Sequence, residues 1–114
     1  MTDLGVQAEQ LAAQYLQQHG LKLIEQNYRS RFGEIDLIMR DGPTVVFIEV
    51  RLRHHAGFGG AAASIDARKQ KRIINTAQQY LAGLVRIPPC RFDVVLLNDA
   101  LEGRMQWLKN AFDA

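Results

Sequence analysis

Two runs of β-branched and large apolar residues flank a turn in the stretch EIDLIMR-DGPT-VVFIEVRLR, residues 34–53. The turn at 41–44 combines Asp, Gly, Pro and Thr, and the first three are residue types typical of tight turns. The stretch therefore predicts a β-hairpin with strands at 34–40 and 45–53. If 41–44 form a symmetric four-residue loop, Asp36 faces Glu49 across the hairpin, and Glu34 faces Arg51.

Asp36 and Glu49 are candidate metal ligands in this register. Directly facing carboxylates repel each other in a sheet, and a hard divalent cation such as Mg²⁺ or Mn²⁺ would offset that repulsion. The alternative interpretation is that Glu34 pairs with Arg51 while Asp36 and Glu49 are merely exposed on a wet sheet face. Spacing alone leaves both open, because a register slip of one residue reverses every face of a strand.

The rest of the chain predicts two helices and three further strands around the hairpin. Apolar positions at helical spacing predict a helix from Leu4 to Gly20 and a second one that Ser64 caps and Pro88 ends. The further strands are expected at 21–28, 92–97 and 104–108. The order is α-β-β-β-α-β-β, which favours an α/β fold with a mixed β-sheet flanked by helices, in a single domain over 1–114.

Composition narrows the class of protein. With 114 residues, 47% hydrophobic and 23% charged, the chain can bury one core and is not expected to be disordered. Its apolar runs are far shorter than the ~20 residues that span a bilayer, and no signal peptide is recognisable, so we expect a cytoplasmic protein with no membrane partner. Cys90 is the only cysteine, which excludes an internal disulfide, and we expect a partly buried thiol.

Basic residues gather on both sides of a glycine-rich segment at 56–63, although the formal net charge is only +2. Such a distribution suits a phosphate-facing surface. The candidates for backbone contacts to nucleic acid are Arg53, Lys69 and Arg72, and the alternative is a merely solvated helix face. The pair His54-His55 is expected to be solvated. We expect Trp107 in the core and leave Phe58 open as a residue that stacks on bases.

Ordered motifs along the chain resemble the YraN family of small bacterial proteins, which are similar to Holliday junction resolvases and restriction endonucleases. The resemblance rests on the hairpin motifs GEIDLI (33–38) and VFIEVRLR (46–53), on GVQAE (5–9) and Ala12 with Tyr15-Leu16 in the first helix, on Lys69, Arg72 and Ala77 in the second, and on RFDVV (91–95). Nearly the whole chain is covered.

This resemblance implies a restriction-endonuclease-like core and a PD-(D/E)xK site, in which an Asp and a Glu hold a metal and a Lys assists the attacking water. Asp36 and Glu49 match the two acids, and Glu9 matches the additional helix acid of the junction-resolving relatives. Arg51 occupies the position of the lysine. Arginine stays protonated, so Arg51 suits phosphate binding or charge stabilisation and not the role of a base.

The leading hypothesis is a Mg²⁺- or Mn²⁺-dependent endonuclease acting on DNA rather than RNA, with branched or distorted DNA as its substrate and Asp36, Glu49, Arg51 and Glu9 as catalytic residues. The rival is a nucleic-acid-binding module that lost catalysis together with the lysine. A third class is an adaptor without a nucleic-acid partner. The sequence leaves the oligomeric state open, with a homodimer as one option.

Overall fold

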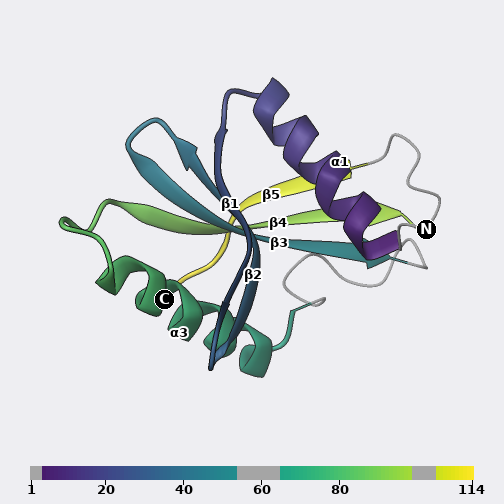
Figure 1. Ribbon diagram of the computed structural model, residues 1–114. Coiled ribbons are helices and arrows are strands. Elements are labelled where there is room, and N and C mark those ends of the chain that lie inside the picture. Colours follow the sequence, from purple (N-terminus) through teal and green to yellow (C-terminus); the bar gives the residue numbers. More distant parts are fainter. Residues whose placement is uncertain (1–3, 54–64, 99–104) are drawn as a thin grey trace.

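The computed structural model describes residues 4–53, 65–98 and 105–114 (Figure 1). In chain order the elements are α1 (Leu4–Gln18), β1 (Lys22–Ser30), β2 (Gly33–Asp41), β3 (Thr44–Arg53), α3 (Ala67–Ala82), β4 (Cys90–Asn98) and β5 (Met105–Phe112). The predicted order α-β-β-β-α-β-β and the predicted mixed sheet are confirmed. The strands are longer than predicted, since β1 extends to Ser30 and β5 to Phe112.

The five strands form one sheet in the order β1-β2-β3-β4-β5. Neighbouring strands are antiparallel except β3 and β4, which are parallel. A parallel pair needs a crossover connection, and α3 lies within the segment that joins β3 to β4. The antiparallel hairpins and this crossover together explain why the sheet is mixed.

The two helices cover opposite faces of the sheet (Figure 1). Each face has its own apolar cluster, and residues adjacent in β3 alternate between the clusters: Val46 and Ile48 pack on the side of α1, whereas Val45 and Phe47 pack on the side of α3. This alternation is the usual consequence of the strand pleat. A side chain of β3 therefore meets α1 or α3 according to its position in the alternation.

The turn between β2 and β3 is tighter than the predicted four-residue loop. Asp41 pairs with Thr44, so the loop consists of Gly42 and Pro43 alone. Gly42 has a φ of 61°, the left-handed conformation that glycine tolerates, and the ring of Pro43 fixes a negative φ. A positive φ followed by a negative one fits a type II′ hairpin turn. The predicted register survives, because the tight loop has the same centre of symmetry.

Both helices end or begin on identifiable caps. Gly20, at a φ of 94°, follows α1, and the N–H groups of Gly20 and Leu21 donate to the carbonyls of Gln17 and Leu16, which is the Schellman arrangement. α3 begins later than predicted: the carboxylate of Asp66 accepts a hydrogen bond of 2.8 Å from the N–H of Lys69 and caps the helix. The predicted cap, Ser64, lies outside the described residues.

Two further expectations are corrected in part. Cys90 is exposed, not partly buried, because it opens β4 directly after Pro88-Pro89. Trp107 is partly buried and packs at the edge of the core on the side of α1. Within the described ranges, neither helix is long and apolar enough to span a membrane.

Candidate active site

Asp36 of β2 and Glu49 of β3 meet where the hairpin strands begin to diverge. The pairing of β2 with β3 runs from Asp41 and Thr44 to Leu37 and Ile48, which is the predicted register, and Asp36 and Glu49 are the next residues beyond it. The two carboxyl groups lie close enough to perturb each other's titration. Both side chains are buried, at 8% and 5% exposure. The interpretation that leaves the pair exposed on a wet sheet face is therefore wrong.

Strict alternation is interrupted at Asp36. Ile35 and Ile38 both belong to the apolar cluster under α3, although residues three apart on a regular strand point to opposite faces. In the register of β1 with β2, Asn27 lies opposite Asp36, and Asn27 has a positive φ of 52°. The irregularity lets the carboxylate of Asp36 accept the N–H of Val50 at 2.8 Å. A backbone donor of β3 thus fixes the orientation of Asp36.

Two cations lie close to the acid pair. The Nζ atom of Lys69, in the first turn of α3, is 3.3 Å from Oε2 of Glu49. The Nη1 atom of Arg51 is 3.8 Å from the same oxygen. The side chains of Lys69 and Arg51 are 37% and 39% exposed, so both reach from solvent toward a buried carboxylate.

The predicted cross-strand pair of Glu34 with Arg51 is wrong. Glu34 forms its ion pair with Arg29 of β1, at 2.9 Å, because those two residues face each other in the β1–β2 register. The pairing of β2 with β3 ends before it reaches Glu34 and Arg51, since the strands diverge at Asp36. Arg51 approaches Glu49, its neighbour two residues earlier on β3, instead.

Burial perturbs the titration of both acids, and the charge of Asp36 adds to the effect on Glu49. Loss of solvent, followed by the negative charge of Asp36, raises the pKa of Glu49 to about 7, and the ammonium group of Lys69 only partly opposes this. Loss of solvent also raises the pKa of Asp36, against the hydrogen bond from Val50. Near neutral pH the pair therefore shares a proton for part of the time, and a cation that displaces this proton would relieve the repulsion.

The residues present fit a magnesium or manganese ion. Two neighbouring carboxylates, which Lys69 and Arg51 reach from solvent, are the donor set that Mg²⁺ uses together with water and phosphate oxygens. The rest of the ligand shell does not come from further acids: the described residues contain no group of three or more potential ligands from His, Cys, Asp and Glu. Glu9 of α1 is half-buried, and the structure does not bring it into such a group with Asp36 and Glu49.

The other predicted contacts divide between described and undescribed residues. Lys69 faces the acid pair, whereas Arg72 lies one turn further along α3 and is exposed. The backbone of Arg53 ends β3, but its side chain lies outside the described residues, as do His54, His55 and Phe58. Sequence reasoning had assigned Lys69 only to backbone contacts, since the fold that brings it to Glu49 is not visible in the sequence.

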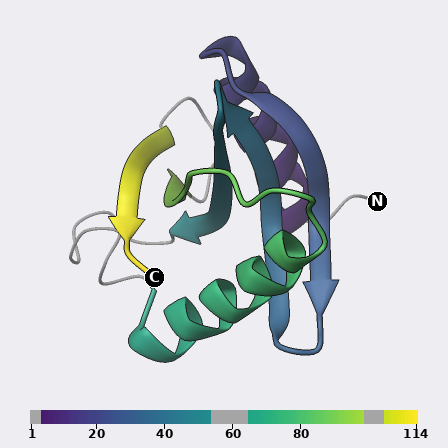
Figure 2. The same ribbon diagram turned by 90° about the vertical axis from the view of Figure 1, so that its left-hand side faces the viewer.

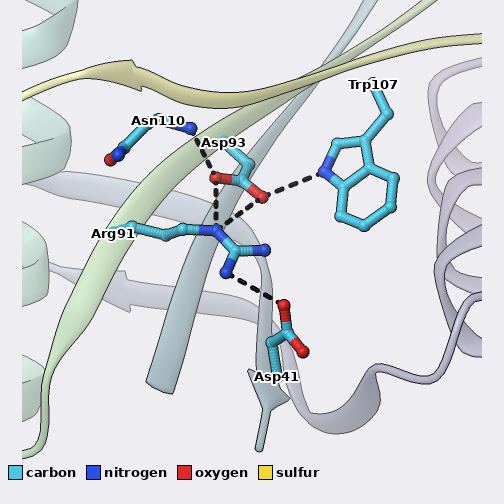
Figure 3. Close-up of polar contacts among 5 residues, drawn as sticks. All are labelled: Asp41, Arg91, Asp93, Trp107 and Asn110. Atoms are coloured by element: carbon cyan, nitrogen blue, oxygen red, sulfur yellow. Dashed lines mark hydrogen bonds and ion pairs between the residues drawn. The ribbon is translucent and has the colours of Figure 1, made fainter.

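Sequence reasoning also missed a third buried carboxylate, Asp93 of β4 (Figure 3). Asp93 is fully buried, and it accepts from Nε of Arg91 at 3.0 Å, from Nε1 of Trp107 at 2.9 Å and from the N–H of Asn110 at 3.0 Å. Arg91 also donates to Asp41 at 3.0 Å. The signal was available, because a charged residue inside an apolar strand is almost never buried without partners.

Comparisons with known proteins find relatives that match nearly the whole chain. The model of the uncharacterised protein family UPF0102 matches residues 8–97. A UPF0102 protein of Nitrosomonas europaea is 60% identical over 109 residues, which cover 96% of this chain and 92% of the relative. A UPF0102 protein of Methylobacillus flagellatus is 51% identical over 114 residues, the full length of both chains, and one of Cupriavidus metallidurans is 56% identical over 98% of this chain and 82% of its own. UPF0102 is the YraN family that the motifs resemble, and this chain belongs to it.

Proposed function

We propose that this protein is a metal-dependent nuclease that hydrolyses phosphodiester bonds in DNA, with branched or distorted DNA as its substrate. The observation that carries the proposal is the buried contact of Asp36 with Glu49, placed within reach of the Lys69 ammonium group. Acids whose pKa values are perturbed by burial and by charged neighbours cluster at functional sites. A purely structural role would favour partners that neutralise both acids fully.

The divergence of β2 and β3 suits such a site. Asp36 and Glu49 stand on two neighbouring strands of a mixed sheet, as the restriction-endonuclease-like resemblance implies. The fold alone would not be a safe guide to activity, because folds host many functions. The proposed function is therefore supported by the chemistry of the two acids and of the cations beside them, and not by the fold.

Asp36 and Glu49 would hold Mg²⁺ or Mn²⁺, which when bound would polarise the scissile phosphate and lower the pKa of a bound water. The N–H of Val50 would keep Asp36 oriented toward the ion. Glu9 has no part in this proposal, because α1 covers the face of the sheet opposite the one on which Glu49 meets Lys69. In a site half-shielded from solvent, preorganised charges of this kind stabilise a transition state more than they would in water.

Lys69 would take the part that the resemblance gives to a lysine on β3. Its Nζ atom lies on the side of Glu49 that faces α3, so the compact ammonium donor comes from the helix while the strand position carries Arg51. Arg51 remains protonated and would hold a non-bridging phosphate oxygen, and Lys69 would donate to the attacking water or to the phosphate. The replacement of lysine by arginine on β3 therefore does not argue against catalysis.

A second candidate function is a nucleic-acid-binding module without catalysis. It is favoured by the position of Lys69 and Arg51, which both approach the same oxygen of Glu49. Two intrinsic cations at one carboxylate can substitute for a metal ion, and the acid pair would then be a structural junction between β3 and α3.

Cleavage assays separate the two functions. Four-way-junction, flap, single-stranded and duplex DNA are incubated with the protein and Mg²⁺ or Mn²⁺, with EDTA as the blank. We expect metal-dependent cleavage, greatest on the junction or flap, that both Asp36→Asn and Glu49→Gln lower by about 10²- to 10⁴-fold, the range for a lost catalytic group. The matched control is Glu25→Gln, an exposed acid of β1, which should cleave like the wild type. No cleavage of any substrate with either metal would contradict the nuclease assignment.

A further inference from the structure

The turn that joins β1 to β2, residues 31–32, is held rigidly against α3. The hydroxyl group of Ser30 accepts from the N–H of Phe32 at 3.0 Å and donates to the hydroxyl of the buried Thr76 at 3.3 Å. Gly33 also lies against α3: a Cβ atom there would be in van der Waals contact with Oγ1 of Thr76 at 3.5 Å and with Cβ of Arg72 at 3.6 Å. Figure 2 shows the hairpin extending past α3, so its turn projects beyond the helix.

This rigid turn presents an aromatic ring to solvent. Phe32 is 37% exposed, and the guanidinium group of Arg31 stands over its ring at 5.0 Å from the centroid. Exposing a phenylalanine at a fixed turn costs hydrophobic free energy that packing it inward would recover. Arginine over an aromatic ring is also a common way to build a surface on which a base can stack.

A hollow of about 480 Å³ lies beside the turn, within the size range of small-ligand sites. Its lining consists of Tyr28, Arg29, Ser30, Arg31 and Gln79. The lining therefore combines an aromatic ring, an amide and two guanidinium groups, of which Arg29 is paired with the exposed Glu34. These groups complement a nucleotide, because the guanidinium groups can bind its phosphate and the aromatic ring and the amide can contact its base.

We propose that the β1–β2 turn binds an unpaired stretch of the nucleic-acid strand, with Phe32 stacked on a base and Arg31 on the adjoining phosphate. The turn and the acid pair lie on the same hairpin and against the same helix, since β2 runs from Gly33 through Asp36 and Gly33 packs on Arg72, one turn of α3 from Lys69. Four residues of strand span roughly 13 Å, the axial rise of about four nucleotides. The inference deepens the proposed function, because an unpaired strand near a junction or flap is what the turn would recognise.

Binding assays in EDTA test this without any dependence on cleavage. The full chain is titrated into a fluorescein-labelled single strand and, separately, into the duplex of the same sequence. We expect Phe32→Ala to weaken binding of the single strand by roughly 5- to 100-fold, the range for one stacked base, and to weaken duplex binding far less. Phe32→Tyr should restore it. Arg31→Ala should weaken binding of both probes and flatten the salt dependence of the affinity.

The matched control is Ile87→Ala, an apolar residue that is 75% exposed in the segment between α3 and β4, and it should leave both affinities unchanged. Equal losses for single strand and duplex in Phe32→Ala, no loss at all, or no binding by the wild type would overturn the inference. If binding depends on Phe32 but no DNA is cleaved in the presence of metal, the proposed role of the turn holds and the nuclease assignment fails. If DNA is cleaved and binding does not depend on Phe32, the nuclease assignment holds and the proposed role of the turn fails.

Discussion

Two buried carboxylate sites lie one register step apart on opposite faces of the same sheet. Asp93 faces Ile48 across the parallel pair of β4 and β3, and Glu49 faces Val94. On the face of α1, Asp93 is surrounded by fixed donors at 2.9–3.2 Å (Figure 3). On the face of α3, Glu49 meets another acid and two long, partly exposed cations at 3.3 and 3.8 Å. The two carboxylates are thus similarly buried, but fixed donors compensate the charge of Asp93 far better than the neighbouring groups compensate the charge of Glu49.

Because their partners differ, we infer different roles for the two sites. Hydrogen bonds from Arg91, Trp107 and Asn110 tie β5 to β4, and the second bond of Arg91 reaches Asp41 at the end of β2, so the Asp93 site joins three strands. The partners of Glu49 are instead long, partly exposed cations, and under the proposed function a divalent metal ion would take their place at the carboxylate. We therefore interpret the balanced charge of Asp93 as structural, and the unbalanced pair of Asp36 and Glu49 as the basis of the proposed metal site.

The largest expected effect is on stability at Asp93. We expect Asp93→Ala to lower the free energy of unfolding by about 3–5 kcal/mol, because it leaves the Arg91 guanidinium buried without its main partner. Urea denaturation measures this. Asp36→Asn is the comparison variant and should leave stability equal or higher, since it removes one of two repelling charges. A similar loss in both variants would erase the distinction between the sites.

The next effect is on the pH dependence of stability. The folded-state pKa of Glu49 is raised to about 7 from 4.5, so the folded chain binds this proton more tightly than the unfolded chain. The resulting stability is fully present below pH 4.5 and is lost as pH rises through about 7. The shift corresponds to roughly 3 kcal/mol. Urea denaturation of the metal-free protein across this pH range should show that the free energy of unfolding declines in the wild type and not in Glu49→Gln. If the free energies of the two proteins instead change with pH in parallel, Glu49 does not have the raised pKa.

Lys69 separates metal binding from catalysis. Lys69→Met should lower cleavage by about 10²-fold, as for the loss of one transition-state donor, while metal affinity stays equal or rises because a competing cation has left Glu49. Cleavage kinetics and calorimetry with Mn²⁺ measure the two quantities. Lys71→Met, an exposed lysine of the same helix, is the matched control. If both variants cleave DNA at the same rate, Lys69 has no role in cleavage.

The smallest effect is expected at Arg51, whose approach to Glu49 is the longer one. Arg51→Lys should keep or raise cleavage, since lysine is a compact donor at the same strand position, and Arg51→Ala should lower it about tenfold through the loss of a phosphate contact. Steady-state kinetics on the best DNA substrate would show this as a rise in KM for the alanine variant. Complete loss of activity in Arg51→Lys would mean that the planar guanidinium itself is required.

The hairpin was predictable from sequence because its turn and its apolar runs agree. DGPT and the flanking strands were enough to set the register that brings Asp36 beside Glu49. The interruption at Asp36 was not predictable, since it depends on the neighbouring strand β1 and on the left-handed Asn27. The approach of Lys69 was hidden for a similar reason: the residues between β3 and α3 give no signal of where the helix begins, and Asp66, not Ser64, caps it.

The claim that Asp36 and Glu49 form a divalent-metal site is tested most directly by Mn²⁺ titration followed by NMR. Paramagnetic Mn²⁺ broadens the amide resonances nearest to it. We expect the signals of Asp36, Glu49 and Val50 to disappear first, and more readily at pH 8 than at pH 6. Asp36→Asn should abolish the effect, and an unshifted signal of Asp93 shows that this variant is folded. Uniform broadening, broadening centred elsewhere, or the same pattern in Asp36→Asn would contradict it.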